Sequence, residues 1–293
     1  MTPSHEIPEQ AWPLFDRYVH GDLSRRGFLE QAAAFAGGPA GAAALLAALS
    51  PDFAAAQQVR PDDVRLSTRR QAFASPDGNG RVDGYLAKPA GEPGRLPAVL
   101  VVHENRGLNP HIEDVTRRVA LAGYLAYAPD ALTPLGGYPG NEDDARALFA
   151  KLDPAKARAD IVAAARGLLD LPDANGSLGV VGFCWGGSLA NHVATQMPEL
   201  AVAVPFYGGA PAVADVPRVK ARLLIHYAGN DERVNAGWPA YEAALKAAGV
   251  RYEQHTYAGT QHGFNNDTTP RYDPAAARLA WERTLAAFKS ALG

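Results

Sequence analysis

Apolar runs of strand length alternate with helix-period segments from Arg65 to the end of the chain, and this alternation constrains the fold most. Each apolar run is bounded by turn residues and predicts a strand, at 82–86, 98–102, 124–127, 178–181, 201–205, 223–227 and 252–257. Helices are predicted between them, at about 111–122, 142–150, 155–170, 185–196, 238–248 and 274–291. Almost continuously apolar strands that alternate with helices indicate an α/β domain whose mainly parallel sheet is covered on both faces.

Composition supports one large domain and excludes several classes of partner. The 293 residues are 47% hydrophobic and 20% charged, which is enough to bury a sizeable core. Formal net charge is −3, without the basic excess that binds phosphate backbones, so we expect no nucleic-acid partner. The single cysteine, Cys184, can form neither an internal disulfide nor a cysteine-rich zinc site. We predict no metal, no cofactor, and a single domain over 57–293.

The first 56 residues differ from the rest of the chain and are predicted to be a targeting signal. Ser24–Leu29 contains the pair Arg25 and Arg26, an uncharged stretch follows over 31–51, and small residues end the segment at 54–56. This pattern is typical of a cleavable twin-arginine export signal, so residues 1–56 would engage the twin-arginine machinery and leave a periplasmic or secreted chain without a stable membrane span. Two alternatives stay open: a retained helical prefix on a cytoplasmic protein, or a single membrane anchor.

A reactive cysteine is indicated where a predicted strand meets a predicted helix. Gly182, Cys184 and Gly186 have the G-x-C-x-G spacing of a nucleophile elbow, with sulfur in place of the usual serine oxygen. The glycines leave room for a sharp turn, and the N-terminus of the following helix favours a thiolate. The alternative is a buried cysteine that packs as a small hydrophobic residue.

A thiol needs a base, and the chain provides candidates in the order expected of an α/β hydrolase. Asp231 follows one predicted strand and His262 follows the next, both after Cys184. Taken singly, Asp231 could be a turn or cap residue and His262 a surface or core histidine. Their placement after successive strands favours a nucleophile–acid–histidine set.

These motifs together resemble the dienelactone hydrolase (carboxymethylenebutenolidase) family. The resemblance spans 65–293 and rests on the motifs at 101–107, 129–130, 182–187, 229–231 and 262–264. It implies an α/β-hydrolase fold with Cys184 as nucleophile, His262 as base and acid, and Asp231 as the group that orients the histidine. It also implies that Glu104 lies against the thiol and that the backbone N–H groups of Asn105 and Trp185 form an oxyanion hole.

Glu104 follows His103, which raises the question of a zinc-protease helix. That signature would require a histidine at position 107, where Gly107 stands, so the metal interpretation fails on spacing. Beside a thiol, the Glu104 carboxylate would raise the pKa of the thiol or accept its proton. The remaining alternative is a solvated loop carboxylate.

Two departures from the family pattern concern the substrate. The dienelactone-cleaving members that this chain resembles hold the substrate carboxylate with two side chains, an arginine after the Pro-Asp segment and a serine after the histidine. Here residues 141–144 read Asn-Glu-Asp-Asp, and Gly263 follows His262. Arg106 is a candidate substitute anchor, and Arg146 is another; either could instead pair with nearby acids.

We therefore expect a cofactor-free hydrolase of small esters or lactones that works through an acyl-thioester. A small-molecule ester or lactone is the predicted partner, and we expect neutral substrates to be cleaved at least as well as anionic ones. The alternatives are an esterase or peptidase acting on larger substrates, and a non-catalytic binding protein that keeps the hydrolase fold.

Overall fold

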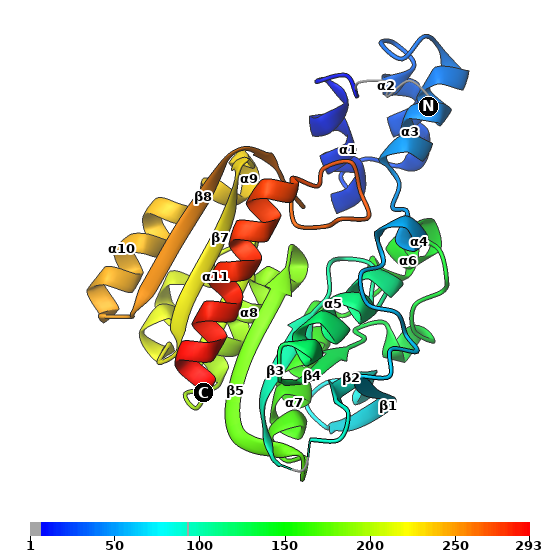
Figure 1. Cartoon of the computed structure of the whole chain (residues 1–293). Coiled ribbons are helices and arrows are strands. Elements are labelled where there is room, and N and C mark those ends of the chain that lie inside the picture. Colours follow the sequence, from blue (N-terminus) through cyan, green and yellow to red (C-terminus); the bar gives the residue numbers. More distant parts are fainter. Residues whose placement is uncertain (1–6, 93) are drawn as a thin grey trace.

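The central element of the computed structural model, which describes residues 7–92 and 94–293, is one eight-stranded sheet (Figure 1). Its spatial order is β1-β2-β4-β3-β5-β6-β7-β8, and the strands pair in parallel from β4 to β8, with antiparallel β1 and β2 at one edge. The strands are β1 (Leu66–Ser75), β2 (Gly80–Pro89), β3 (Leu96–Val102), β4 (Leu125–Pro129), β5 (Ala174–Phe183), β6 (Val202–Phe206), β7 (Arg222–Asn230) and β8 (Tyr252–Gln261).

Helices cover both faces of this sheet, as the alternation predicted. One hydrophobic cluster packs α5 (Pro110–Leu121) and α11 (Pro274–Leu292) on one face. A second cluster packs α7 (Pro154–Leu169), α8 (Trp185–Gln196) and α10 (Trp238–Ala248) on the other. Shorter pieces lie in the connections: α6 (Glu142–Phe149), α9 (Glu232–Asn235) and the 3₁₀ turns Thr133–Leu135 and Val213–Arg218. The predicted α/β fold with a mainly parallel sheet is confirmed.

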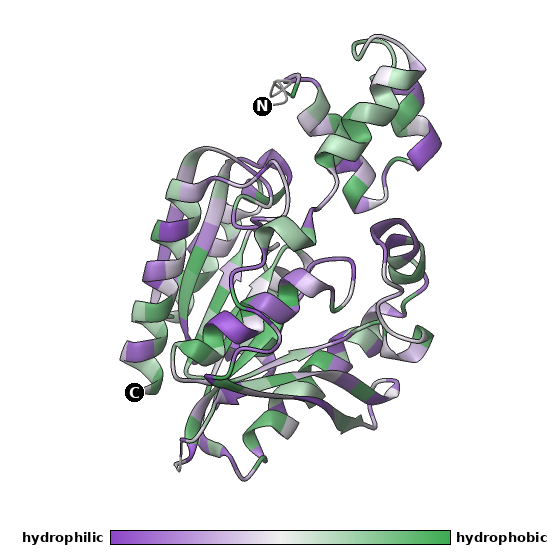
Figure 2. Cartoon of the chain, turned by 45° about the vertical axis from the view of Figure 1, so that its right-hand side comes forward, coloured by the Kyte–Doolittle hydropathy of each residue, from purple (hydrophilic) through white to green (hydrophobic). Residues whose placement is uncertain are grey.

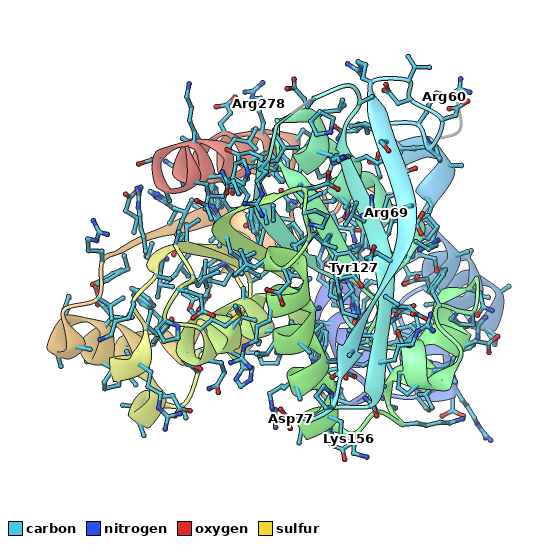
Figure 3. The ribbon with its side chains drawn as sticks, turned by 90° about the horizontal axis from the view of Figure 1, so that it is seen from below. Arg60, Arg69, Asp77, Tyr127, Lys156 and Arg278 are labelled. Atoms are coloured by element: carbon cyan, nitrogen blue, oxygen red, sulfur yellow. The ribbon has the colours of Figure 1, made fainter. Side chains whose placement is uncertain are left out.

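Strand β1 was not predicted, and its composition explains why. Its sequence is polar, and most of its side chains are half-buried or exposed, because it forms the outer edge of the sheet. The Tyr127 hydroxyl on β4 donates a hydrogen bond to the backbone oxygen of Gln71 on β1, at 3.1 Å. Figure 3, a view from below, shows Arg69 and Tyr127 in this edge region. Pairing with β2, which sequence periodicity does not reveal, makes this segment a strand.

Residues 7–50, called the N-terminal segment below, form three helices with a hydrophobic core of their own (Figures 1 and 2). The helices are α1 (Ala11–His20), α2 (Arg25–Ala32) and α3 (Pro39–Leu49). The Phe28 side chain is fully buried, and its ring lies 6.2 Å from Phe15 and 5.5 Å from Tyr18 between ring centroids. The sequence predicted an export signal over residues 1–56, with a retained helical prefix as one alternative; the structure forms packed helices here, and the first six residues of the predicted prefix lie outside the described residues.

The uncharged stretch that suggested a membrane anchor is divided in the structure. By length and composition, 39–56 could cross a membrane, and 17% of that window is buried. Helix α3 ends at Leu49, however, and a separate short helix, α4 (Phe53–Ala56), begins after Asp52. The backbone N–H of Asp52 donates to the oxygen of Thr268 at 2.7 Å, which ties this connection to the loop after β8.

Candidate active site

Cys184 lies at a strained turn between β5 and α8. Its φ is +54°, a backbone conformation that non-glycine residues rarely adopt. A Cβ at Gly182 would lie 1.9 Å from the Gly186 oxygen, and one at Gly186 would lie 2.3 Å from the Val102 oxygen. Both positions therefore require glycine because backbone passes close by, and the turn presents the sulfur at the end of the central strand.

The structure brings His262 and Asp231 together beside Cys184. His262 follows β8, Asp231 follows β7, and the Nδ1 atom of the histidine lies 2.5 Å from the Asp231 Oδ2 atom. The other Asp231 oxygen accepts the backbone N–H of Val234 at 3.3 Å and caps α9, so this residue is both a cap and a partner of the histidine. A hydrogen bond at Nδ1 leaves Nε2 as the atom free to exchange a proton at the sulfur.

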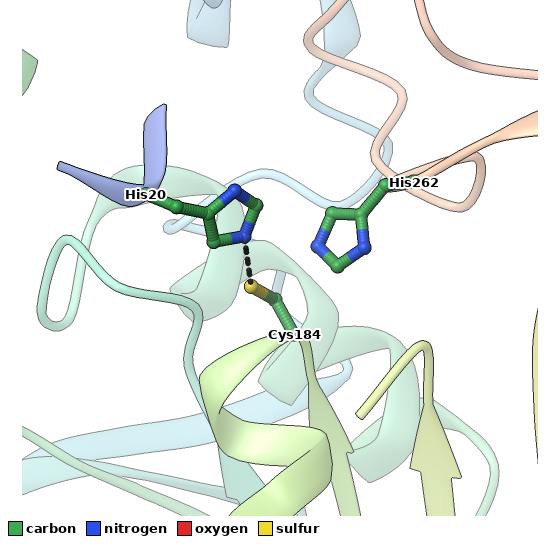
Figure 4. A group of neighbouring side chains, drawn as sticks. All are labelled: His20, Cys184 and His262. Atoms are coloured by element: carbon green, nitrogen blue, oxygen red, sulfur yellow. Dashed lines mark hydrogen bonds between the residues drawn. The ribbon is translucent and has the colours of Figure 1, made fainter. Parts of the chain in front are cut away.

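A second histidine, which the sequence analysis did not single out, also reaches the sulfur. His20 is the last residue of α1, and its Nε2 atom lies 3.4 Å from the Cys184 Sγ atom (Figure 4). The two histidine rings meet edge to face with centroids 4.9 Å apart. Positions 20 and 184 are too far apart in sequence for any local motif to link them, so only the fold could reveal this contact.

The buried charges at the site reinforce one another. Burial alone would raise the pKa of the Cys184 thiol, but the imidazolium groups of His262 and His20 lower that pKa to about 6. Burial alone would lower the pKa of His262, yet the thiolate and Asp231 raise it to about 9. The pKa of His20 is raised in the same way, by the thiolate and Asp16, to about 10. A thiolate flanked by imidazolium groups is the favoured state near neutral pH.

A cavity of about 270 Å³ opens beside the sulfur. Its lining residues come from the N-terminal segment, the elbow and the loops after the strands: His20, Asn105, Phe149, Cys184, Trp185, Ser188, Tyr207, Gly209, Arg233, Val234 and His262. Trp185 is the first residue of α8, so its backbone N–H has no carbonyl four residues earlier within the helix to bind. Asn105 and Trp185, the two predicted oxyanion donors, thus border the same cavity as the sulfur.

Glu104 is held on the neighbouring loop. Its Oε2 atom accepts a hydrogen bond from the Asn266 side chain at 2.9 Å. Burial and the nearby Glu104 carboxylate raise the pKa of the Tyr207 phenol well above its ordinary value. Glu104 lines a second cavity of about 340 Å³ that also contains Arg106 and Glu142, whereas Cys184 lines the cavity of about 270 Å³. Sequence reasoning missed Asn266 and Tyr207 as neighbours of this carboxylate.

The two candidate anchors for a substrate carboxylate are both engaged. Arg106 is buried, its Nε atom lies 3.6 Å from a Glu142 oxygen, and burial lowers the pKa of its guanidinium. Burial raises the pKa of Glu142. Arg146 stacks over the Tyr18 ring of the N-terminal segment, with its Cζ atom 3.8 Å from the ring centroid. Glu142, the first residue of α6, therefore neutralises Arg106 instead of leaving it free for an anion.

Arg271 occupies the space beside Gly263, the residue that follows His262. Gly263 has a φ of +87°, and a Cβ there would lie 3.2 Å from the Arg271 Cζ atom. Among the described residues, the Nε and Nη1 atoms of Arg271 have no hydrogen-bond partner although they are buried. Its guanidinium lies 5.2 Å from the centroid of the Phe15 ring. A larger side chain at 263 would be strained in backbone and would displace this guanidinium.

Other residues of the sequence motifs stabilise loops at the site. The His103 Nε2 atom accepts the Ala131 backbone N–H at 3.1 Å, and its ring stacks on Trp185 with centroids 5.2 Å apart. The Asp130 carboxylate accepts backbone N–H groups of the loops on either side of it, from Leu108, Leu132 and Tyr138. These contacts fix the loop that carries Glu104 and Asn105.

The donor atoms of His20, Cys184 and His262 lie within 4.8 Å of one another. Nitrogen and sulfur donors of this kind suit Zn²⁺. The raised pKa values of His20 and His262 put a hydrogen on these ring nitrogens near neutral pH, however, and a histidine must be neutral to bind a metal. The donor set fits a metal in atom type but not in charge.

Comparison with known proteins places most of the chain in one family. The family model for the dienelactone hydrolase family matches residues 82–292, and a YqhI-like model matches residues 2–37. A "Putative carboxymethylenebutenolidase" of Escherichia coli K12 is 32% identical over 78% of this chain and 89% of its own length. A hydrolase fragment of the same organism, YghX, is 55% identical over 39% of this chain and 97% of its own length.

Solved structures agree with this assignment. A "Putative Dienelactone Hydrolase" from Klebsiella pneumoniae superimposes with a TM-score of 0.67 and 29% identity, over 76% of this chain and 99% of its own. A mutant of the esterase rPPE shares the fold at 18% identity, with a TM-score of 0.63 over 97% of both chains. From the family match, the relatives and the fold together, the chain belongs to the dienelactone hydrolase family and is a hydrolase.

Proposed function

We propose that this protein hydrolyses small esters or lactones with Cys184 as nucleophile, His262 as proton carrier and Asp231 as the residue that orients the histidine. The observation that carries the proposal is the elbow: a sulfur held at positive φ at the end of β5, beside a histidine whose Nδ1 atom lies 2.5 Å from a buried carboxylate. A merely structural cysteine would need neither the strained turn nor the charged neighbours.

The proposed cycle begins with the Cys184 thiolate and the His262 imidazolium. The sulfur adds to the carbonyl carbon, and the resulting oxyanion accepts hydrogen bonds from the backbone N–H groups of Asn105 and Trp185. The bond from carbon to the leaving oxygen breaks, and that oxygen takes the proton from the His262 Nε2 atom, which leaves an acyl-thioester. In a lactone, the released hydroxyl stays attached to the acyl chain.

The second half of the cycle restores the enzyme. The neutral His262 takes a proton from water while the water oxygen adds to the thioester carbonyl. The second tetrahedral intermediate collapses with the thiolate as leaving group, and the acid product dissociates. Asp231 keeps the imidazole in one orientation and stabilises its charge in both halves.

The size of the site supports a small substrate. The cavity beside the sulfur measures about 270 Å³, just below the range of roughly 300–1,000 Å³ typical of ligand pockets. Because Glu142 neutralises Arg106, that side chain offers a substrate carboxylate little net attraction. We therefore propose that neutral esters or lactones are preferred over dienelactone, and that larger esters and peptides are poor substrates.

The test uses the fact that Cys184 is the only cysteine in the chain. An activated neutral ester is mixed with the protein, the reaction is stopped with acid within the first turnover, and the intact mass is measured. We expect one acyl group on the wild-type protein, none on Cys184→Ala, and hydrolysis abolished in that variant. Wild-type hydrolysis rates in Cys184→Ala would refute the nucleophile, and no turnover of any ester by the wild type would favour a binding protein.

We also propose export through the twin-arginine machinery, a proposal that rests on the pattern at Ser24–Leu29 and the uncharged stretch after it. Helices α1–α3 pack together and contact the rest of the chain, so we propose that the segment is retained after export and is not cleaved. Replacing Arg25 and Arg26 with Lys should confine the chain to the cytoplasm. Unchanged export of that variant, or a wild type found in the cytoplasm alone, would end this proposal.

A further inference from the structure

The C-terminal end of α1 enters the site beside the elbow. Gly21, with a φ of +91°, ends the helix directly after His20, and its backbone N–H donates to the Tyr18 oxygen at 3.3 Å. The last carbonyl oxygens of a helix can accept further donors from outside it. The hydrolase domain supplies such donors. Arg146 donates to the Tyr18 backbone oxygen at 3.0 Å, and the side chains of Asn105 and Arg106 donate to the Val19 backbone oxygen at 2.8 and 3.1 Å. A helix C-terminus carries partial negative charge, so this arginine-rich surface is its electrostatic complement.

Side-chain contacts fix the same helix laterally. The Tyr18 hydroxyl and an Arg25 nitrogen both donate to the Asp143 carboxylate, at 2.5 and 2.6 Å. Asp16 lies 3.6 Å from Arg233 and 3.9 Å from Arg271. These contacts join α1 and α2 to the segments after β7 and β8 and to α6.

The charges that face His20 determine its state. Its Nδ1 atom lies 2.8 Å from the backbone oxygen of Asp16 and 3.2 Å from the Asp16 carboxylate, so Nδ1 carries a hydrogen. Its Nε2 atom faces the Cys184 sulfur at 3.4 Å and Arg233 at 2.9 Å. The Arg233 side chain is about half exposed and can turn toward Asp16 and solvent, whereas the sulfur is fixed. Because a guanidinium only donates, the charged form of His20 requires Arg233 to turn toward the Asp16 carboxylate, which lies 3.6 Å from its Nε atom, and the Nε2 hydrogen then faces the sulfur alone.

We propose that the N-terminal segment is a permanent part of the active site and that its His20 is the second cationic partner of the Cys184 thiolate, beside His262. The inference rests on the proposed thiol mechanism and adds a residue to it. His262 must lose and regain its proton in every turnover, as described above. His20 has no such task, so it can keep its charge and hold the sulfur ionised between turnovers.

The test measures how readily Cys184 is alkylated by iodoacetamide as a function of pH, with EDTA present to remove adventitious metal. We compare the full-length wild type with His20→Gln, which keeps a hydrogen-bond donor but loses the charge. Because an opposite charge at this distance shifts a pKa by about one to three units, we expect the midpoint of alkylation to rise by that amount. Hydrolysis should fall near pH 7 and recover at higher pH.

Tyr18→Phe is the matched control. It removes the hydrogen bond to Asp143 two residues before His20 and leaves the histidine in place. We expect its alkylation midpoint to match the wild type, and hydrogen exchange of α1 in His20→Gln to show that the segment stays docked. An unchanged midpoint in His20→Gln overturns the proposal, and so do equal shifts in both variants, because docking alone would then explain them.

The outcomes keep this inference apart from the proposed function. If Cys184→Ala kept hydrolysing esters, the nucleophile would be wrong, while the alkylation profile would still report on the contact between His20 and the sulfur. If Cys184→Ala is inactive and His20→Gln is alkylated and active like the wild type at every pH, the nucleophile stands and the role of His20 falls.

Discussion

At the scale of single residues, the glycines beside Cys184 show how the elbow is built. In Gly186→Ala the new Cβ would lie 2.3 Å from the Val102 oxygen and 2.5 Å from the His103 oxygen, both backbone atoms that cannot move independently. We expect the free energy of unfolding to fall by about 1–3 kcal/mol or more, together with loss of activity because the oxyanion donors shift. Urea unfolding measures the first effect and ester hydrolysis the second.

Gly237→Ala provides the control for that prediction. Gly237 has an ordinary φ of −78°, and its nearest atom to a new Cβ is the Val234 oxygen at 3.6 Å. The expected change in the free energy of unfolding is within about 0.5 kcal/mol. Equal stabilities for the two variants would show that the elbow can relax and that close backbone approach does not explain Gly186.

Arg106 allows the substrate preference to be tested at one side chain. Its guanidinium already faces Glu142 at 3.6 Å and binds the oxygens of Asn105 and Val19 at 2.8 and 3.1 Å. For a matched pair of neutral and anionic esters, we expect wild-type kcat/KM to be at least as high for the neutral member. Arg106→Gln should change both values by a similar factor. A strong wild-type preference for the anion that disappears in Arg106→Gln would show that this arginine binds the substrate carboxylate.

At the scale of elements, the sequence predicted the helices and strands that build the inner sheet and its covering layers. The predicted strand at 98–102 is β3 without its first two residues, and the predicted helix at 185–196 is α8. In each segment the apolar residues recur with the spacing of that element, so the local pattern agrees with the burial seen in the fold. Strand β1 and the contact of His20 with Cys184 depend on partners distant in the chain, and no local pattern encodes them.

The sequence of the N-terminal segment is compatible with more than one structure. Its uncharged stretch of Ala, Gly and Leu is what a signal peptide and a small helical core both require. The distinguishing feature is the set of aromatic side chains at Phe15, Tyr18 and Phe28, which pack against one another across α1 and α2. Such clustering is visible only after the helices are placed.

Phe28→Ala tests whether these helices form a unit of their own. The ring is fully buried in the core of the N-terminal segment, so its loss should cost about 3–5 kcal/mol of that unit's stability. We expect backbone hydrogen exchange to accelerate throughout α1, α2 and α3 while β3 and β5 stay protected. Arg26→Ala, at an exposed residue that pairs with Glu30, should change neither. Faster exchange of the central strands in Phe28→Ala would show instead that the segment and the sheet unfold together.

At the scale of the whole molecule, three distant parts of the chain meet at one sulfur, and the pH dependence of activity reports on their assembly. The Cys184 thiol has a pKa lowered to about 6, so the thiolate forms as the pH rises through that value. The pKa of His262 is raised to about 9, so the imidazolium that protonates the leaving group is lost as the pH rises through that value. Both required forms coexist only between these limits.

We therefore expect kcat/KM for a neutral ester to follow a bell, with an acid limb near pH 6 and an alkaline limb near pH 9. The acid limb reports the ionisation of the Cys184 thiol. At low pH His262 stays charged, as the reaction requires, but the protonated sulfur can no longer attack the carbonyl. Rates are measured from pH 5 to 10 with a substrate that does not titrate in this range. An activity that rises only near pH 8.5, where an unperturbed thiol ionises, would mean that the imidazolium groups do not stabilise the thiolate in solution. In Phe28→Ala we expect the alkaline limb to stay in place, because His262 belongs to the hydrolase domain. The acid limb should move to higher pH, because the substitution loosens the segment that carries His20.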